Sequence, residues 1–305
     1  MPEGWCSSLF PVYIEYARVA VLLSCLTLAG YRDVKSREVS DRLWIVMGLA
    51  GGVLLLLGDS SAGLLALLTD ALVVFFVLEH FVTWEDYLQS GENLPLVIEV
   101  GIYIMVVAFV TYGYLDHSGI VTSQVLAIVA TVIISRALFE ARLLYGGADA
   151  KALMASAVVL PLLAAPFPFL VTSPGYVQST LLSIMPLPIT MLIDGAILTL
   201  FIPLGIFAYN LRRGYHEFPE AFFLYEIPTE ELPRKFVWLR KPLPEGDEDV
   251  ETAEDDRELR KSEARRLTDL GIDRVYVTPQ LPMVAALAAG AVLAVLVGNV
   301  LFLLM

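Results

Sequence analysis

The sequence predicts an all-α polytopic membrane protein: a bundle of about eight transmembrane helices with a small cytoplasmic α/β insert. Composition is the first observation behind this fold class. Of the 305 residues, 57% are hydrophobic and only 17% are charged, and the mean hydropathy is +0.70. Soluble domains are closer to half apolar and a quarter charged. The second observation is that the apolar residues are grouped into long segments, as helices that cross a bilayer require.

A helical span needs roughly 20 mostly apolar residues. Eight segments qualify, and they cover residues 11–31, 42–58, 62–82, 95–115, 119–141, 150–172, 188–210 and 281–304. The first seven would form a membrane core over 1–210, and the eighth a C-terminal helix within 281–305. We expect the sixth span to kink or end at a group of prolines, because proline lacks a backbone donor: Pro161, Pro166 and Pro168.

The positions of lysine and arginine predict the orientation, because these residues gather in cytoplasmic loops. Of the 20 basic residues, 19 follow the first span, flank the join of the fifth and sixth, or lie between the seventh and eighth. With eight spans these regions share one side, so we expect a multi-pass protein of the cell membrane with both termini outside. The remaining residue, Arg18, can pair with Glu15 on one helix face.

Residues 211–280 form the sizeable soluble part. Residues 236–239 and 274–278 are β-branched and aromatic, which favours short strands. Between them, Thr252 begins a helix pattern that Gly271 ends. We therefore expect a strand–helix–strand insert. Its 17 acidic residues outnumber its 12 basic ones, which is typical of a solvated surface; the alternative is that it attracts a basic peptide.

The same composition argues against several functions. A net charge of −13 excludes a nucleic-acid partner on electrostatic grounds. Cys6 and Cys25 have no CxxC arrangement, and the three histidines are scattered, so we predict no metal site and no cofactor.

The residues that suggest chemistry are Asp33 and Asp149. Asp33 follows the first span and Asp149 precedes the sixth, so the predicted topology puts both at the cytoplasmic face. Two carboxylates brought close together share a proton, because both cannot ionise easily. One can then take a proton from water while the other donates to a carbonyl oxygen or leaving amine. The alternative is that both are interfacial acids paired with nearby basic residues.

A glycine pair precedes the second aspartate. Gly146 and Gly147 supply conformational freedom and leave room for another backbone beside Asp149, although glycine pairs also mark ordinary helix boundaries. Lys151 adds a positive charge close to Asp149, or serves as a topology anchor.

These residues resemble a known family. Residues 146–151, Gly-Gly-Ala-Asp-Ala-Lys, are similar to the GxGD-x-K signature of the intramembrane aspartic peptidases that process type IV prepilins and archaeal preflagellins. Asp33 with the turn up to Asp41 is similar to the first motif of that family. Two positions depart from the pattern: Ala148 replaces the second glycine, and Asp41 stands where asparagine is common.

The resemblance implies a membrane aspartic endopeptidase with Asp33 and Asp149 as the catalytic pair. Its substrates would be pilin-like or flagellin precursors, each with a short basic leader and an apolar N-terminal helix that lies in membrane lipid. The chain is most similar to the archaeal preflagellin peptidase branch. The bacterial branch of the family usually has a cysteine-rich loop between the first two spans and also methylates its product. This chain has no cysteine in that loop, so the resemblance implies no methyltransferase activity.

Two other functions are compatible with the sequence. An ion- or proton-coupled transporter would depend on intramembrane acids, namely Asp70, Glu99, Asp149 and Asp194. For Asp70, Glu99 and Asp194 we instead expect structural pairing or a water-filled cavity. A non-catalytic membrane scaffold would depend on the insert. The peptidase alone requires both Asp33 and Asp149.

Overall fold

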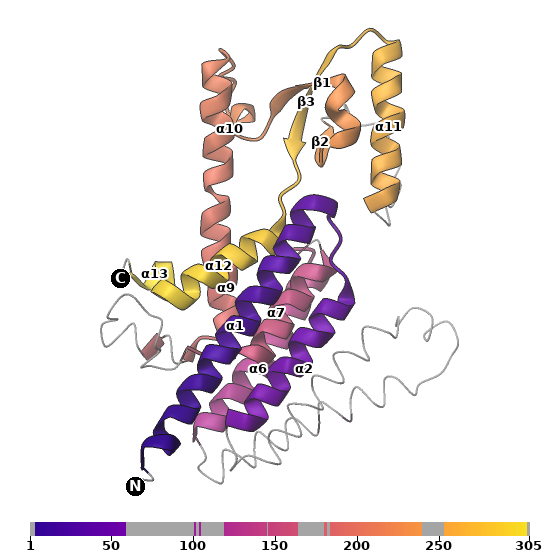
Figure 1. The fold of residues 1–305 in the computed structure, drawn as a ribbon. Coiled ribbons are helices and arrows are strands. Elements are labelled where there is room, and N and C mark those ends of the chain that lie inside the picture. The colour runs from indigo at the N-terminus through magenta and orange to yellow at the C-terminus, as the bar shows by residue number, and fades with distance from the viewer. Residues whose placement is uncertain are drawn as a thin grey trace.

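The computed structural model describes residues 4–58, 101, 104, 119–144, 146–163, 180–181, 184–239 and 253–303. They form a helical bundle and a smaller unit of one sheet, one α-helix and short 3-10 turns (Figure 1). The chain is mostly helical, as the sequence predicts. The predicted span 62–82 lies outside the described residues, as does all of 95–115 except two positions.

Four helices of the bundle match predicted apolar segments. They are α1 (Gly4–Ser36), α2 (Asp41–Gly58), α6 (Gly119–Glu140) and α7 (Gly147–Val159). The last of these ends well before residue 172, where the predicted span ends. Pro161 explains the early stop, because a residue before proline is disfavoured in helical geometry. Leu160 accordingly has φ −143° and ψ 87°.

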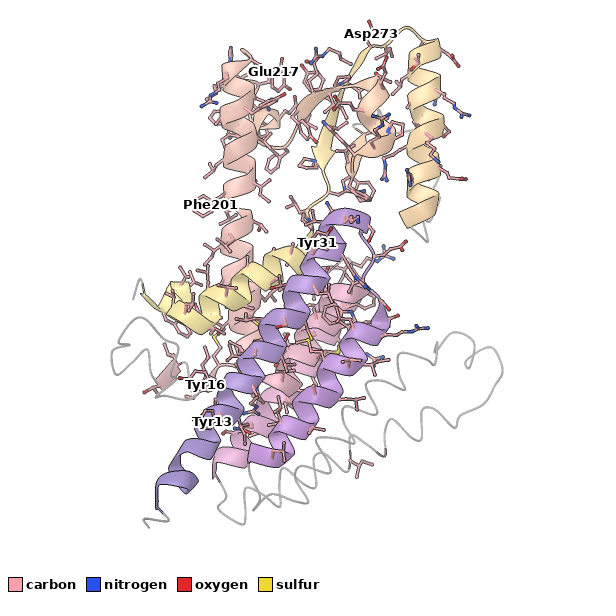
Figure 2. The ribbon with its side chains drawn as sticks, viewed as in Figure 1. Tyr13, Tyr16, Tyr31, Phe201, Glu217 and Asp273 are labelled. Carbon is pink, nitrogen blue, oxygen red and sulfur yellow. The ribbon has the colours of Figure 1, made fainter. Side chains whose placement is uncertain are left out.

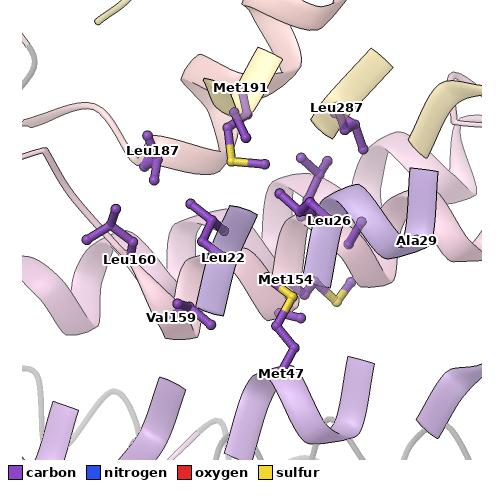
Figure 3. Close-up of a cluster of buried hydrophobic side chains, with 14 of the residues drawn as sticks. Leu22, Leu26, Ala29, Met47, Met154, Val159, Leu160, Leu187, Met191 and Leu287 are labelled. Carbon is purple, nitrogen blue, oxygen red and sulfur yellow. The ribbon is translucent and has the colours of Figure 1, made fainter. Parts of the chain in front are cut away.

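The core of the bundle lies between α1, α2 and α7. It extends to Leu187, Met191 and Leu287 of two helices later in the chain (Figure 3). Leu22 and Leu26 of α1 are fully buried in it, as are Met47 of α2 and Leu153 of α7. The α2 and α7 backbones approach closely, because a Cβ on Gly51 would lie 2.8 Å from Val159 backbone atoms. Small residues permit such close helix contact, and this close packing holds α2 against the C-terminal end of α7.

The predicted span 188–210 is two stacked helices, α9 (Leu187–Thr199) and α10 (Phe201–Arg212). By length and composition, Leu187–Arg212 is one of two described helical stretches that can cross a membrane, and Tyr13–Ser36 is the other. The predicted final span 281–304 is divided into α12 (Met283–Val297) and α13 (Val300–Leu303). Gly298, at φ +82°, makes the break. The two long apolar stretches, Tyr13–Ser36 and Leu187–Arg212, indicate membrane association.

The insert contains the predicted strand–helix–strand pattern and one further strand. In order, its elements are η2 (Glu220–Phe222), β1 (Tyr225–Pro228), η3 (Thr229–Arg234), β2 (Val237–Leu239), α11 (Ala253–Asp269) and β3 (Arg274–Pro279). The antiparallel sheet has the order β1-β3-β2, with Ile227 opposite Val275 and Trp238 opposite Thr278. The strand β1 was not predicted, because its four residues include a glutamate and a proline. Gly271, at φ +72°, follows the end of α11 as predicted.

The insert stands on one end of the bundle. Figure 1 shows β3 running down into the start of α12, beside the C-terminal end of α1. Figure 2 labels Glu217 and Asp273 at the end of the molecule farthest from the N-terminus of α1. The ends of α1 and α7, which carry the two candidate aspartates, therefore lie close to the insert.

Candidate active site

Asp33 lies in the last turns of α1 and is held by the beginning of another helix. The residue is 8% exposed, and its Oδ2 accepts a 3.0 Å hydrogen bond from the backbone N–H of Val284. Val284 is the second residue of α12, whose first N–H groups have no partner within the helix. Asp33 thus supplies the cap that α12 lacks locally, and the positive end of the helix dipole stabilises its negative charge.

Asp149 is the third residue of α7 and is 7% exposed. Its backbone N–H donates to the carbonyl oxygen of Gly146 at 3.0 Å. A Cβ on Gly146 would lie 2.8 Å from the Asp149 Oδ2 atom, whereas a Cβ on Gly147 would meet nothing closer than 4.0 Å. Gly146 has an ordinary backbone φ of −99°. Gly146 therefore does not need the conformational freedom expected of it. Its lack of a side chain makes room for the Asp149 carboxylate.

Ala148 is a helical residue in the first turn of α7. This explains how the chain tolerates its departure from the GxGD pattern, since alanine is the best helix former and helical geometry does not require glycine. Its side chain also lines the cavity described next.

The two aspartates line one cavity of about 730 Å³, although the chain separates them by more than a hundred residues. Gly146 and Ala148 line the same cavity. A cavity with two buried carboxylates can hold a water molecule and an extended peptide. The carboxylates can then exchange protons with the water and with the peptide.

Lys151 and Asp41 join the two motifs outside this cavity. The Lys151 Nζ lies 2.9 Å from the Asp41 Oδ1, which connects the first turn of α2 with the beginning of α7. Both side chains are partly exposed. The ion pair aligns the start of α2, which follows Asp33 in the chain, with the start of α7, which carries Asp149. Gly147, like this pair, does not line the cavity.

Arg37 joins the site to the insert. Its guanidinium lies 3.9 Å from Asp33 Oδ1, donates a hydrogen bond to the carbonyl oxygen of Gln280, and stands 5.1 Å from the centre of the Phe236 ring. Arg37 also has a positive φ of 61°, which L-residues rarely adopt. The sequence does not predict this role for Arg37, because both of its partners in the insert are about 200 or more positions away and no local pattern indicates them.

Trp238 of β2 forms an apolar wall of the same cavity and is 59% exposed. The exposed side chains of Leu143 and Leu281 line it as well. The cavity therefore combines buried acids with an open apolar surface, to which the insert contributes Trp238. Nothing in the sequence marks Trp238 apart from its being an aromatic residue in a short strand.

The other acids weighed in the sequence are placed only in part. Asp194 is fully buried in α9, and its Oδ1 accepts a 3.0 Å hydrogen bond from the N–H of Val300 at the start of α13. Asp70 and Glu99 lie outside the described residues. Across the described part of the chain, no group of three or more His, Cys, Asp or Glu side chains could hold a metal ion.

Comparison with models of known protein families finds no match to this chain, and comparison with curated proteins finds none either. The interpretation of the cavity therefore depends on its own geometry and on the two motifs.

Proposed function

We propose that this chain is a membrane aspartic endopeptidase in which Asp33 and Asp149 form the catalytic pair. One observation carries the proposal: two buried carboxylates from distant parts of the chain line a single cavity. Buried acids are costly unless paired or used, and two of them in one open cavity are typical of acid–base chemistry.

The pair acts as a unit. With one proton shared between them, the ionised carboxylate removes a proton from a water molecule that attacks a peptide carbonyl. The protonated carboxylate donates to the developing oxyanion or to the leaving amine. The proton belongs to the pair rather than to either aspartate. Gly146 supports this arrangement by leaving room for the Asp149 carboxylate.

The proposed substrates are type IV prepilin-like or preflagellin precursors, from which the enzyme would remove a short basic leader at the cytoplasmic face. The motif resemblance supports this substrate class. The apolar wall formed by Trp238 and Leu281 suits the apolar helix that follows such a leader. The acidic excess of the insert suits the leader itself.

The proposed setting is a bundle of eight transmembrane helices with both termini outside. Two long apolar helices support it, and so do apolar side chains exposed on the outer faces of α1 and α2, which suit contact with lipid: Leu28, Val34, Val46, Val53 and Leu57.

Of the acids that a transporter would use, the described residues include Asp149, which lines the candidate cavity, and Asp194, whose Oδ2 is buried without a hydrogen-bond partner. Asp194, the described mid-helix acid, accepts a hydrogen bond at the start of α13 and thereby supports the break after α12. This is a structural role of the kind that the sequence analysis expects for it.

The deciding experiment is cleavage of a leader-bearing precursor by the purified full-length protein. Asp33→Asn and Asp149→Asn should each abolish cleavage and leave the protein folded. Asp194→Asn is the matched control, since it also removes one buried carboxylate yet keeps an acceptor for Val300. Normal cleavage by either of the first two variants would refute the catalytic pair. Loss of cleavage in Asp194→Asn as well would show that cleavage does not depend specifically on the Asp33–Asp149 pair.

A further inference from the structure

A second cavity, of about 440 Å³, lies where the insert meets the bundle and is separate from the candidate active site. Among the residues that the structure describes, four basic side chains and one carboxylate line it: Lys35, Arg234, Arg257, Arg260 and Glu38. Such an excess of positive charge stands out in a chain whose net charge is −13. We call it the basic cavity.

Three elements bring these side chains together. Lys35 is in the last turn of α1, Arg234 ends η3, and Arg257 and Arg260 lie three positions apart on α11. Residues at this spacing share one face of a helix. The basic cavity is therefore assembled by the folding of the insert onto α1.

Arg260 gives the basic cavity a fixed wall. It is 5% exposed, and its guanidinium lies 5.5 Å from the centre of the Phe236 ring, which also lines the cavity. The same ring lies beneath Arg37, the residue that contacts Asp33. A buried guanidinium held against an aromatic face is oriented before a ligand arrives, and this lowers the entropic cost of binding.

The basic cavity lies at the boundary between an apolar surface and a charged one. Leu28, Tyr31 and Lys35 are spaced along one face of α1, and the first two are 46% and 63% exposed. Figure 2 shows Tyr31 near the end of α1 that meets the insert, whereas Tyr13 and Tyr16 lie toward the other end. The Lys35 Nζ stands 5.9 Å from the Tyr31 ring centre. On the other side of the basic cavity from Lys35, the wall is formed by α11, which is rich in charged residues.

We propose that the basic cavity binds a phosphate group, and that the headgroup of an anionic phospholipid supplies it. Arginine and lysine together bind phosphate through charge-assisted hydrogen bonds. Basic residues next to an apolar helix surface are placed as a membrane-bound protein needs them to meet acidic headgroups. The acyl chains would follow the exposed face of Leu28 and Tyr31 on α1. A bound headgroup connects α1 with η3 and α11, and so holds the insert against the bundle.

The test uses full-length protein in a neutral detergent. The probes are dihexanoyl phosphatidylglycerol, dihexanoyl phosphatidylcholine and inorganic phosphate, and the measurements are the melting temperature and the Kd from calorimetry. Phosphatidylglycerol should raise the melting temperature, whereas phosphatidylcholine and inorganic phosphate should not at equal concentration. Lys35→Gln or Arg257→Gln should each raise the Kd about fivefold, and the double variant about 30-fold.

Arg265→Gln is the matched control, because it removes the same charge from α11 outside the basic cavity and should leave the Kd unchanged. Arg257→Lys keeps the charge and should retain most of the affinity. An equal response to inorganic phosphate would overturn the lipid source. Absence of binding, or equal losses in Arg257→Gln and Arg265→Gln, would overturn the site itself. None of these measurements uses peptide cleavage, so the outcome is independent of the proposed peptidase activity.

Discussion

The backbone N–H of Val284 donates a 3.0 Å hydrogen bond to the Asp33 carboxylate across 251 positions of the chain. One side chain therefore has two tasks: it faces the candidate cavity and it caps α12. Asp33→Asn removes the ionisable carboxyl group, so it should abolish cleavage. It keeps an acceptor oxygen for Val284, so stability should change little. Asp33→Ala should abolish cleavage and also cost about 1 kcal/mol of unfolding free energy.

Denaturant titration of the two Asp33 variants beside the wild type separates these tasks. If Asp33→Asn destabilises the protein as much as Asp33→Ala does, the hydrogen bond to Val284 is not the stabilising contact.

The two glycines before Asp149 should respond differently to alanine. In Gly146→Ala the new methyl group must displace the Asp149 Oδ2, a flexible atom, so stability should change little while the carboxylate moves. A misplacement near 1 Å can reduce the rate on the order of 100-fold. Gly147→Ala is the control, since its Cβ meets no atom closer than 4.0 Å. The prediction fails if kcat/KM is equal for the two variants.

Arg37 and Arg142 form a matched pair for separating backbone strain from side-chain contacts. Both have positive φ, 61° and 56°, so glycine relieves about 1 kcal/mol of strain at either position. Arg142→Gly should therefore stabilise the protein slightly. Arg37→Gly also loses the contacts with Gln280, Phe236 and Asp33, together about 2 kcal/mol. It should lower stability and speed hydrogen exchange in β2 and β3.

Faster exchange in β2 and β3 that appears equally in Arg142→Gly would show that Arg37 does not hold the insert. A cleavage assay on the same variants would show whether attachment of the insert affects the Asp33–Asp149 pair.

The ion pair between Lys151 and Asp41 should be measurable by charge exchange. Partly exposed pairs contribute little, so Asp41→Lys and Lys151→Asp should each reduce stability modestly. The double variant should recover part of the loss, with a coupling energy of about 0.5 kcal/mol. Thermal unfolding of all four proteins gives this value. Additive losses would mean that the two starts of α2 and α7 are aligned by packing instead.

Trp238 should affect substrate binding more than stability, because its side chain is mostly exposed yet lines the cavity. Trp238→Ala should raise KM roughly tenfold with kcat little changed, as expected for the loss of apolar contact area. Trp238→Phe should retain most of the affinity. A fall in kcat with unchanged KM would place Trp238 in the chemical step and contradict this assignment.

Part of the fold was predictable because local patterns encode it. Long apolar runs predicted α1, α2 and α6, Pro161 predicted the end of α7, and Gly271 the end of α11. The pairing of Arg18 with Glu15, three positions apart on one helix, was predictable for the same reason, and the atoms lie 2.8 Å apart. The strand β1 was missed because its stability comes from pairing with β3, not from its own composition.

The two candidate aspartates, one after and one before an apolar segment, and Gly146 ahead of the second could be identified from local sequence patterns. Local patterns do not indicate that Asp33 caps α12, that Arg37 meets the insert or that Trp238 lines the cavity; these follow from the packed structure. The physical reason is the range of the interactions. Helix periodicity and proline or glycine stops act over a few residues, whereas these contacts depend on how helices and strands far apart in the chain pack together.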